Sequence, residues 1–106
     1  MDSSSSIEKN NMTKRSMLLD RLNEVHSFPG PYTFKVIGTN SDEFLESVVR
    51  VVNETLGDGA EPDVSTRESS GGKHLSVTVS VEVSDAESVL EIYAGFRELD
   101  AARFVL

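Results

Sequence analysis

The 106 residues contain no cysteine and no tryptophan, only three prolines, and no apolar run near the ~20 residues that a membrane-spanning helix needs. The lack of cysteine excludes a disulfide framework, thiolate zinc sites and a cysteine nucleophile. The N-terminus also lacks the hydrophobic stretch of a secretory signal. We therefore expect a cytoplasmic protein that has no contact with a membrane and consists of a single domain.

Acidic side chains outnumber basic ones by 18 to 10, so the formal charge is -8 with neutral histidines. This negative field opposes binding to nucleic-acid phosphates. Residues 1–12 contain a serine run and little apolar surface, which predicts a disordered tail, because such a segment cannot offset its ordering entropy by burial. The folded domain is expected over residues 13–106.

Apolar residues at helical spacing predict a short helix over residues 13–25 and two longer helices, one capped by Asn40 or Ser41 and one opened by Ser84. Period-two alternation predicts strands over residues 32–38 and 73–83, a weak edge strand over residues 61–68, and a short strand over residues 102–106. The two long helices are expected to bury two apolar stripes, namely Leu45, Val48, Val49, Val52 and Leu56, then Ala86, Val89, Leu90, Tyr93 and Phe96.

After the first helix, the predicted order is strand, helix, strand, strand, helix, strand. Right-handed crossovers then favour a ferredoxin-like βαββαβ α+β sandwich, a four-stranded antiparallel sheet with both long helices on one face. The first and third strands are expected at its centre. A four-residue hairpin loop would pair Thr66 with Leu75 and Val64 with Val77, which keeps Val64 on the apolar face.

The uncovered face of the sheet is the surface on which we expect a ligand or a partner to bind. Its short hydroxyl side chains leave room beside basic residues on neighbouring strands. In the last strand, alternation predicts that Arg103 and Val105 join this face, and that Phe104 and Leu106 point inward. The candidate residues are Thr33, Lys35, Ile37, Arg67, His74, Ser76, Thr78 and Arg103. An ordinary solvated face is the alternative interpretation.

Residues 28–38 have the sequence FPGPYTFKVIG, which resembles the phenylalanine–proline, aromatic, lysine–valine–x–glycine signature of the YbeD-like family of small bacterial proteins of unknown function. The serine–glycine hairpin before residues 76–79 and the closing residues 99–106 are similar to that family's central hairpin and last strand. The resemblance covers about residues 17–106. It implies a fold like that of regulatory ACT domains, and a regulatory role.

A second candidate site is the turn formed by Thr39, Asn40 and Ser41, which leads into a helix N-terminus and could bind a small anion. An ordinary capped turn is the alternative. The two histidines, His26 and His74, have no spacing that suits a metal, so neither a metal nor a cofactor is expected.

Taken together, these patterns favour a non-enzymatic regulatory or adaptor domain that acts by self-association, through a protein partner or by binding a small metabolite. The alternative is a small enzyme or enzyme accessory that uses Lys35, Arg67, His74 and Arg103 on the open face. Nucleic-acid binding is a second alternative. It is disfavoured by the charge and by the lack of aromatic side chains at the central-strand positions of the open face.

Overall fold

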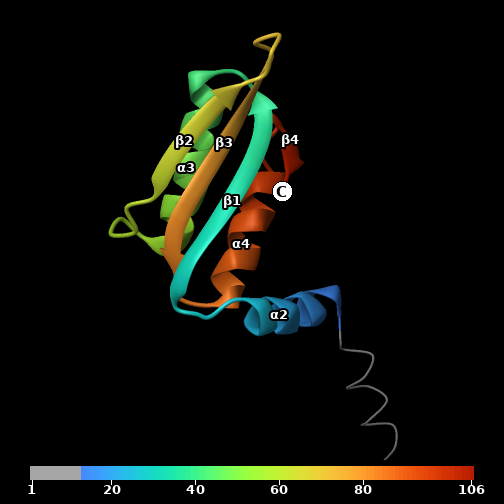
Figure 1. Cartoon of the computed structure of the whole chain (residues 1–106), viewed down its shortest axis with the longest axis vertical. Coiled ribbons are helices and arrows are strands. Elements are labelled where there is room, and N and C mark those ends of the chain that lie inside the picture. The colour runs from blue at the N-terminus through green and yellow to red at the C-terminus, as the bar shows by residue number, and fades with distance from the viewer. Residues whose placement is uncertain (1–12) are drawn as a thin grey trace, which may run out of the picture.

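The computed structural model describes residues 13–106, which form a two-layer sandwich of helices on a sheet (Figure 1). The elements in chain order are α2 (Lys14–Val25), β1 (Gly30–Thr39), α3 (Asp42–Leu56), β2 (Asp63–Glu68), β3 (His74–Val83), α4 (Ala86–Arg97) and β4 (Ala102–Val105). The strands pair antiparallel in the order β2-β3-β1-β4. This arrangement confirms the predicted βαββαβ fold with β1 and β3 at the centre. The tail predicted for residues 1–12 lies outside the described residues.

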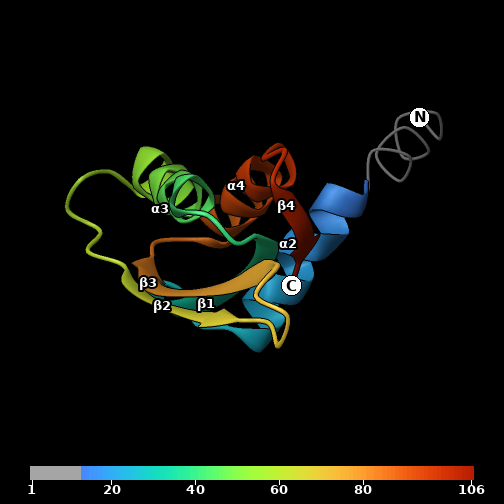
Figure 2. The ribbon, with the colours of Figure 1, turned by 90° about the horizontal axis from the view of Figure 1, so that it is seen from above.

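Helices α3 and α4 lie on one face of the sheet, and the opposite face, called the open face below, is left uncovered by them (Figure 2). Alternation in β3 creates this division, because Leu75, Val77, Val79, Val81 and Val83 point into the core while the residues between them point outward. Burial of each such aliphatic side chain stabilises the fold by about 1.5–3 kcal/mol. The predicted orientation of this strand is confirmed.

The helical stripes that cover the sheet differ in part from the prediction. Val48 and Val52 of α3 are buried as expected, but Phe44 joins them and Val49 is only partly buried. In α4 the buried stripe includes Ile92, whereas Leu90 lies outside the core cluster. The prediction placed each stripe from helical spacing alone, which fixes the apolar face of a helix but not which of its residues are the most deeply buried.

The N-terminus of α3 is capped by Ser41, whose hydroxyl oxygen accepts a hydrogen bond of 3.1 Å from the backbone N–H of Phe44. Ser41 was one of the two predicted capping residues. The other, Asn40, instead donates from its side-chain amide to the backbone carbonyl of Gly72, at 2.9 Å. Asn40 therefore ties the start of α3 to the hairpin turn between β2 and β3.

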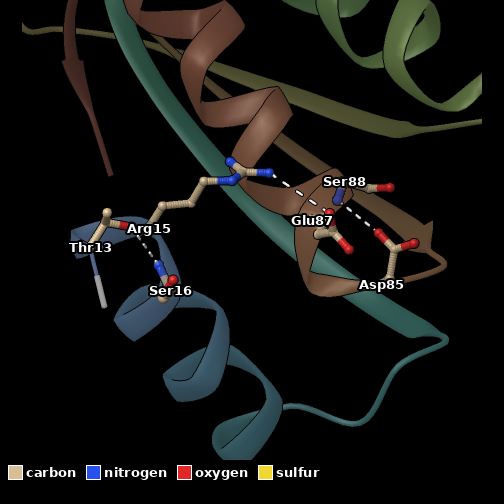
Figure 3. A network of polar contacts seen from close by, with 6 residues as sticks. All are labelled: Thr13, Arg15, Ser16, Asp85, Glu87 and Ser88. Atoms are coloured by element: carbon tan, nitrogen blue, oxygen red, sulfur yellow. Dashed lines mark hydrogen bonds and ion pairs between the residues drawn. The ribbon is translucent and has the colours of Figure 1, made fainter. Parts of the chain in front are cut away.

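Helix α4 is capped by Asp85, so the prediction of Ser84 as its capping residue is wrong. A carboxylate oxygen of Asp85 accepts a hydrogen bond of 2.8 Å from the backbone N–H of Ser88 (Figure 3). This bond lowers the pKa of Asp85, and the carboxylate also faces the positive end of the helix dipole. The first turn of α4 also holds Glu87, which lies 4.0 Å from the guanidinium of Arg15 and links α4 to α2.

The hairpin between β2 and β3 differs from the predicted register by two residues. Val64 pairs with Val79 rather than with Val77, but it stays on the core side, as the parity argument required. The difference arises because Ser69 extends the ladder, its N–H donating to the carbonyl of His74 at 2.9 Å. The turn then occupies residues 70–73, where Gly72 adopts a left-handed φ of 72°.

Strand β4 faces the opposite way from the prediction. Phe104 pairs with Ile37 on the open face, and Val105 packs against the core. A bulge at Ile37 and Gly38 causes this reversal, because it leaves Arg103 outside the paired positions and moves the alternation by one residue. The predicted outward position of Val105 and inward position of Phe104 are therefore both wrong.

Leu106 extends the same pattern beyond β4. Its N–H donates to the carbonyl of Lys35 at 2.8 Å, and its carbonyl accepts from the Lys35 N–H at 3.4 Å. Residues joined in this way share a face of the sheet. Leu106 therefore lies on the open face beside Lys35, which corrects the prediction that it points inward.

Gly38 lies at the bulge, where β1 approaches other parts of the backbone closely. A Cβ atom at this position would lie 2.6 Å from the ring of Phe44 and against the backbone carbonyl of Ala101. Only glycine fits there. An isolated glycine inside a strand is a known signal for a bulge or a close backbone approach, so this residue carried information that the prediction did not use.

Replacement of Gly38 by alanine is expected to lower the free energy of unfolding by about 2 kcal/mol or more, because the backbone of Ala101 cannot move away cheaply. Urea denaturation measures this change. Gly59→Ala is the matched control, since a Cβ there meets nothing within 4 Å, and it should be neutral or slightly stabilising. Equal stability of the two variants would contradict the close packing at Gly38.

Candidate functional site

The sheet register arranges the open face in rows of directly opposed side chains. Residues in one row lie on neighbouring strands and share the outward direction. One row consists of Arg67, Ser76, Ile37 and Phe104, and the adjacent row consists of Ser65, Thr78, Lys35 and Leu106. Basic and apolar side chains thus surround a floor of short hydroxyl side chains.

A hollow of about 270 Å³ opens over β2, β3 and β1, on the side of these rows away from β4. Its lining combines three basic side chains with polar and apolar neighbours, namely Lys35, Ile37, Arg67, Glu68, Ser69, His74 and Ser76. Three strands contribute, so the hollow exists only once the sheet has formed. Most of the residues predicted for the open face meet here, and we call this site the basic hollow.

The cations of the basic hollow are not neutralised by ion pairs. Within residues 13–106 the structure records an ion pair only between Arg15 and Glu87. Glu68 also lines the hollow, but its carboxylate lies more than 4.0 Å from the side-chain nitrogens of Lys35 and Arg67. Two permanent positive charges are therefore available to a ligand on a chain whose formal charge is -8.

Ser76 lines the hollow, and its Oγ atom is buried without a hydrogen-bond partner. Elsewhere on the same face, the hydroxyls of Thr33 and Ser80 bond to each other at 2.9 Å. A buried hydroxyl without a partner costs about 1–3 kcal/mol of desolvation. The absence of a bond from His74 also means that Ser76 is not held as an activated nucleophile in this structure.

The Ser76→Ala variant should be as stable as the unaltered protein or up to about 1 kcal/mol more stable, because it removes a desolvated hydroxyl that bonds to nothing. Ser80→Ala is the matched control on the same strand and face. It loses a hydrogen bond to Thr33 and should be destabilised by about 0.5–1.5 kcal/mol. Thermal unfolding compares the two, and an equal loss in both variants would show that Ser76 has a partner.

The remaining candidates of the open face lie outside the hollow. Thr78 lies between Ser65 and Lys35, and Thr33 is engaged with Ser80. Arg103 is exposed at the bulge of β4 and does not line the hollow. Arg103 is therefore not among the residues that line the hollow with Lys35, although the predicted alternation placed both on the open face.

An apolar strip beside the hollow consists of Ile37, Phe104 and Leu106, and the prediction missed it. Phe104 and Leu106 are 63% and 62% exposed, and both come from the edge of the sheet. Ile37 is half-buried between Phe104 and Ser76 in the same row. The glycine signal at the bulge was the feature of the sequence that could have revealed this strip.

Tyr93 of α4 holds the end of the chain in place beneath this strip. Its hydroxyl lies 3.2 Å from that of Tyr32 and donates to the carbonyl of Leu106 at 3.4 Å. Burial raises the pKa of Tyr93 well above its usual value of 10.0, and the hydrogen bond with Tyr32 raises it further. The neutral phenol is therefore the form that the folded protein stabilises.

This raised pKa predicts a loss of stability in alkali. Above about pH 10 the unfolded chain releases the Tyr93 proton while the folded chain retains it, so the free energy of unfolding falls as pH rises. Chemical denaturation at pH 8 and at pH 11 should show a smaller decrease for Tyr93→Phe than for the unaltered protein. An identical decrease in both would show that Tyr93 does not contribute.

The second candidate site, at Thr39, Asn40 and Ser41, has its polar groups engaged within the fold. Ser41 caps α3, Asn40 bonds to the hairpin turn, and the N–H of Thr39 donates to the carbonyl of Ala101 at 3.0 Å. The adjoining hollow, of about 340 Å³, is lined by two carboxylates, Glu43 and Asp100, among other residues. These negative charges disfavour an anion there.

Residues 13–106 contain no group of three or more His, Asp or Glu side chains placed to hold a metal ion. In the same residues, no helix combines the length and the apolar character required to cross a membrane.

The fold defines an ACT-like α+β domain. The solution structure of protein HP0495 from H. pylori matches 76% of this chain and 85% of its own, with a TM-score of 0.66 at 22% identity. The ACT domain of GTP pyrophosphokinase from Chlorobium tepidum matches 72% of this chain and 94% of its own, with a TM-score of 0.53 at 6% identity. At these identities the similarity establishes the shared fold alone.

The sequence comparisons identify the family. The model described as "Protein of unknown function (DUF493)" matches residues 23–106, and the chain belongs to this family. A UPF0250 protein of Shewanella piezotolerans is 36% identical over 85% of this chain and all of its own length. The UPF0250 protein YbeD of Escherichia coli O1:K1 / APEC is 34% identical over 81% of this chain and 97% of its own. The YbeD-like resemblance seen in the sequence is confirmed.

Proposed function

We propose that this protein is a non-enzymatic regulatory or adaptor module that binds another protein through its open face. The observation that carries the proposal is the apolar strip, where Phe104 and Leu106 stand more than 60% exposed beside Ile37 on a face that neither α3 nor α4 covers. Burial of each of these side chains at an interface would contribute about 1.5–3 kcal/mol. An aromatic side chain beside aliphatic ones, with Lys35 next to Leu106 and Arg67 at the far end of the row, matches the composition of protein interfaces.

The edge of the sheet supports binding at the same place. Strand β4 has only four residues and pairs with β1 on one side, so its other side has no neighbouring strand within the described residues. Short edge strands limit uncontrolled pairing, yet they still offer free N–H and C=O groups to one specific partner. Either a second copy of the chain or a different protein would satisfy both the strip and the edge.

The enzyme alternative receives less support from the site. Ser76 is the buried hydroxyl of the hollow, and it has no base bonded to it. His74 lies two residues earlier on the same strand, and alternate residues of one strand are about 6.5–7 Å apart, which is too far for a direct hydrogen bond. The regulatory interpretation also agrees with the ACT-like fold, by analogy alone.

The Phe104→Glu variant tests the proposal, because it places a charge in the centre of the strip. Val25→Glu is the matched control, since Val25 is 65% exposed and belongs to α2 rather than to the sheet. Both variants should fold with nearly unchanged stability. Sedimentation velocity at micromolar to millimolar concentration measures self-association, and crosslinking in the native cells followed by mass spectrometry identifies other bound proteins.

The expected result is a complex, with itself or with another protein, that forms with the unaltered chain and with Val25→Glu but is lost with Phe104→Glu. A complex that survives in Phe104→Glu would place the interface elsewhere. If the unaltered chain is monomeric at every concentration and crosslinks to nothing, the proposal is wrong.

A further inference from the structure

The basic hollow differs in chemistry from the apolar strip beside it. The strip offers only hydrocarbon, whereas the hollow presents the side chains of Arg67, Lys35 and His74 from three different strands. Neither Arg67 nor Lys35 has an acidic partner within 4.0 Å among the described residues. The protein as a whole is acidic, yet these cations come from separate strands and have no acidic partner within residues 13–106. The apolar strip does not explain why they lie together.

Ser76 adds an independent observation that points to a ligand. Ser76 lines the hollow, but its Oγ is turned away from the open space and has no hydrogen-bond partner, although it can donate one bond and accept others. Rotation about the Cα–Cβ bond of Ser76 would turn this hydroxyl toward an oxyanion in the hollow, and the oxyanion would also receive the two parallel N–H groups of the Arg67 guanidinium. The same group would therefore satisfy Ser76 and neutralise the neighbouring cations.

The charge around the hollow favours a single negative charge over a double one. Glu68 is part of the lining, and the whole chain carries a formal charge of -8. Repulsion from these groups grows with the charge of the ligand, so a phosphate dianion is disfavoured more than a carboxylate. The guanidinium fork of Arg67 matches the planar geometry of a carboxylate.

The walls and the size of the hollow define the rest of the ligand. Ile37 forms one wall and leads along its row to exposed Phe104, which provides an apolar path away from the charged end. The volume of about 270 Å³ lies just below the range of about 300–1,000 Å³ that is usual for ligand pockets. A short molecule with one apolar group fits this space.

We infer that the basic hollow binds the carboxylate of a small organic acid whose apolar part lies against Ile37 and extends toward Phe104. Arg67 and Lys35 hold the two carboxylate oxygens, and the Ser76 hydroxyl, once rotated into the hollow, donates its proton to one of them. The inference rests on the proposed function, because the acid would bind on the same open face and alter the surface that a protein partner meets.

The test uses the purified full chain and three probes, followed by NMR chemical shifts and isothermal titration calorimetry. The first probe is 4-methylpentanoate, the second is its uncharged isostere 4-methylpentanamide, and the third is inorganic phosphate. We expect saturable binding of the carboxylate with a Kd of about 1 mM or tighter, and shifts centred on Ile37 and Ser76. The amide and phosphate should each bind at least about tenfold more weakly.

Variants locate the site on the sheet. Arg67→Gln should weaken binding of 4-methylpentanoate by about tenfold or more, because it removes a charge-assisted bidentate contact. Arg103→Gln is the matched control, since Arg103 is an exposed arginine of the same sheet that does not line the hollow. It changes the net charge equally and should leave the affinity unchanged.

Several outcomes would overturn the inference. Equal binding of the amide would show that no carboxylate is recognised, and tighter binding of phosphate would assign a different ligand class. If Arg67→Gln and Arg103→Gln weaken binding of 4-methylpentanoate equally, the effect comes from the overall charge of the protein and not from the hollow. If no probe binds but Phe104→Glu still abolishes a protein complex, the ligand inference fails and the proposed function stands.

Discussion

Alternation in the central strand β3 is the constraint on which the rest of the structure depends. Its valines point toward α3 and α4, and its serines and threonines point away, so one choice of face defines both the core and the open surface. A shift by one residue would expose the whole apolar set, at a cost of about 1.5–3 kcal/mol for each side chain. This energy difference keeps the hydroxyl face of the sheet outward.

The chemistry of the open face follows from the small size of those hydroxyl side chains. Because Ser76 and Thr78 are short, longer residues on the flanking strands reach over them, and Arg67 and Lys35 form the walls of the basic hollow. At the other end of the row, the bulge at Gly38 turns Phe104 outward. Charged and apolar groups thus meet on one face although different strands supply them.

The shared fold and the particular surface carry different kinds of information. The ACT domain of the Chlorobium tepidum enzyme has the same arrangement of elements at 6% identity, which shows how many sequences satisfy the packing of two helices on this sheet. Function is determined by the side chains that a particular chain displays on that scaffold. In this chain, the basic hollow and the apolar strip are features that the packing of the helices on the sheet does not require.

Local patterns in the sequence were sufficient for the order of elements, the inward valines of β3, the hydroxyl face and the family signature around Lys35 and Gly38. The patterns behind these features extend over several residues, so each residue adds support to the same structural prediction. Tertiary structure alone decided the register of Val64 and the outward turn of Phe104. Strand β4 is too short for alternation to define its phase, and its bulge depends on Gly38 meeting Phe44 and Ala101. Those contacts bring together segments far apart in the chain, and no local pattern records them.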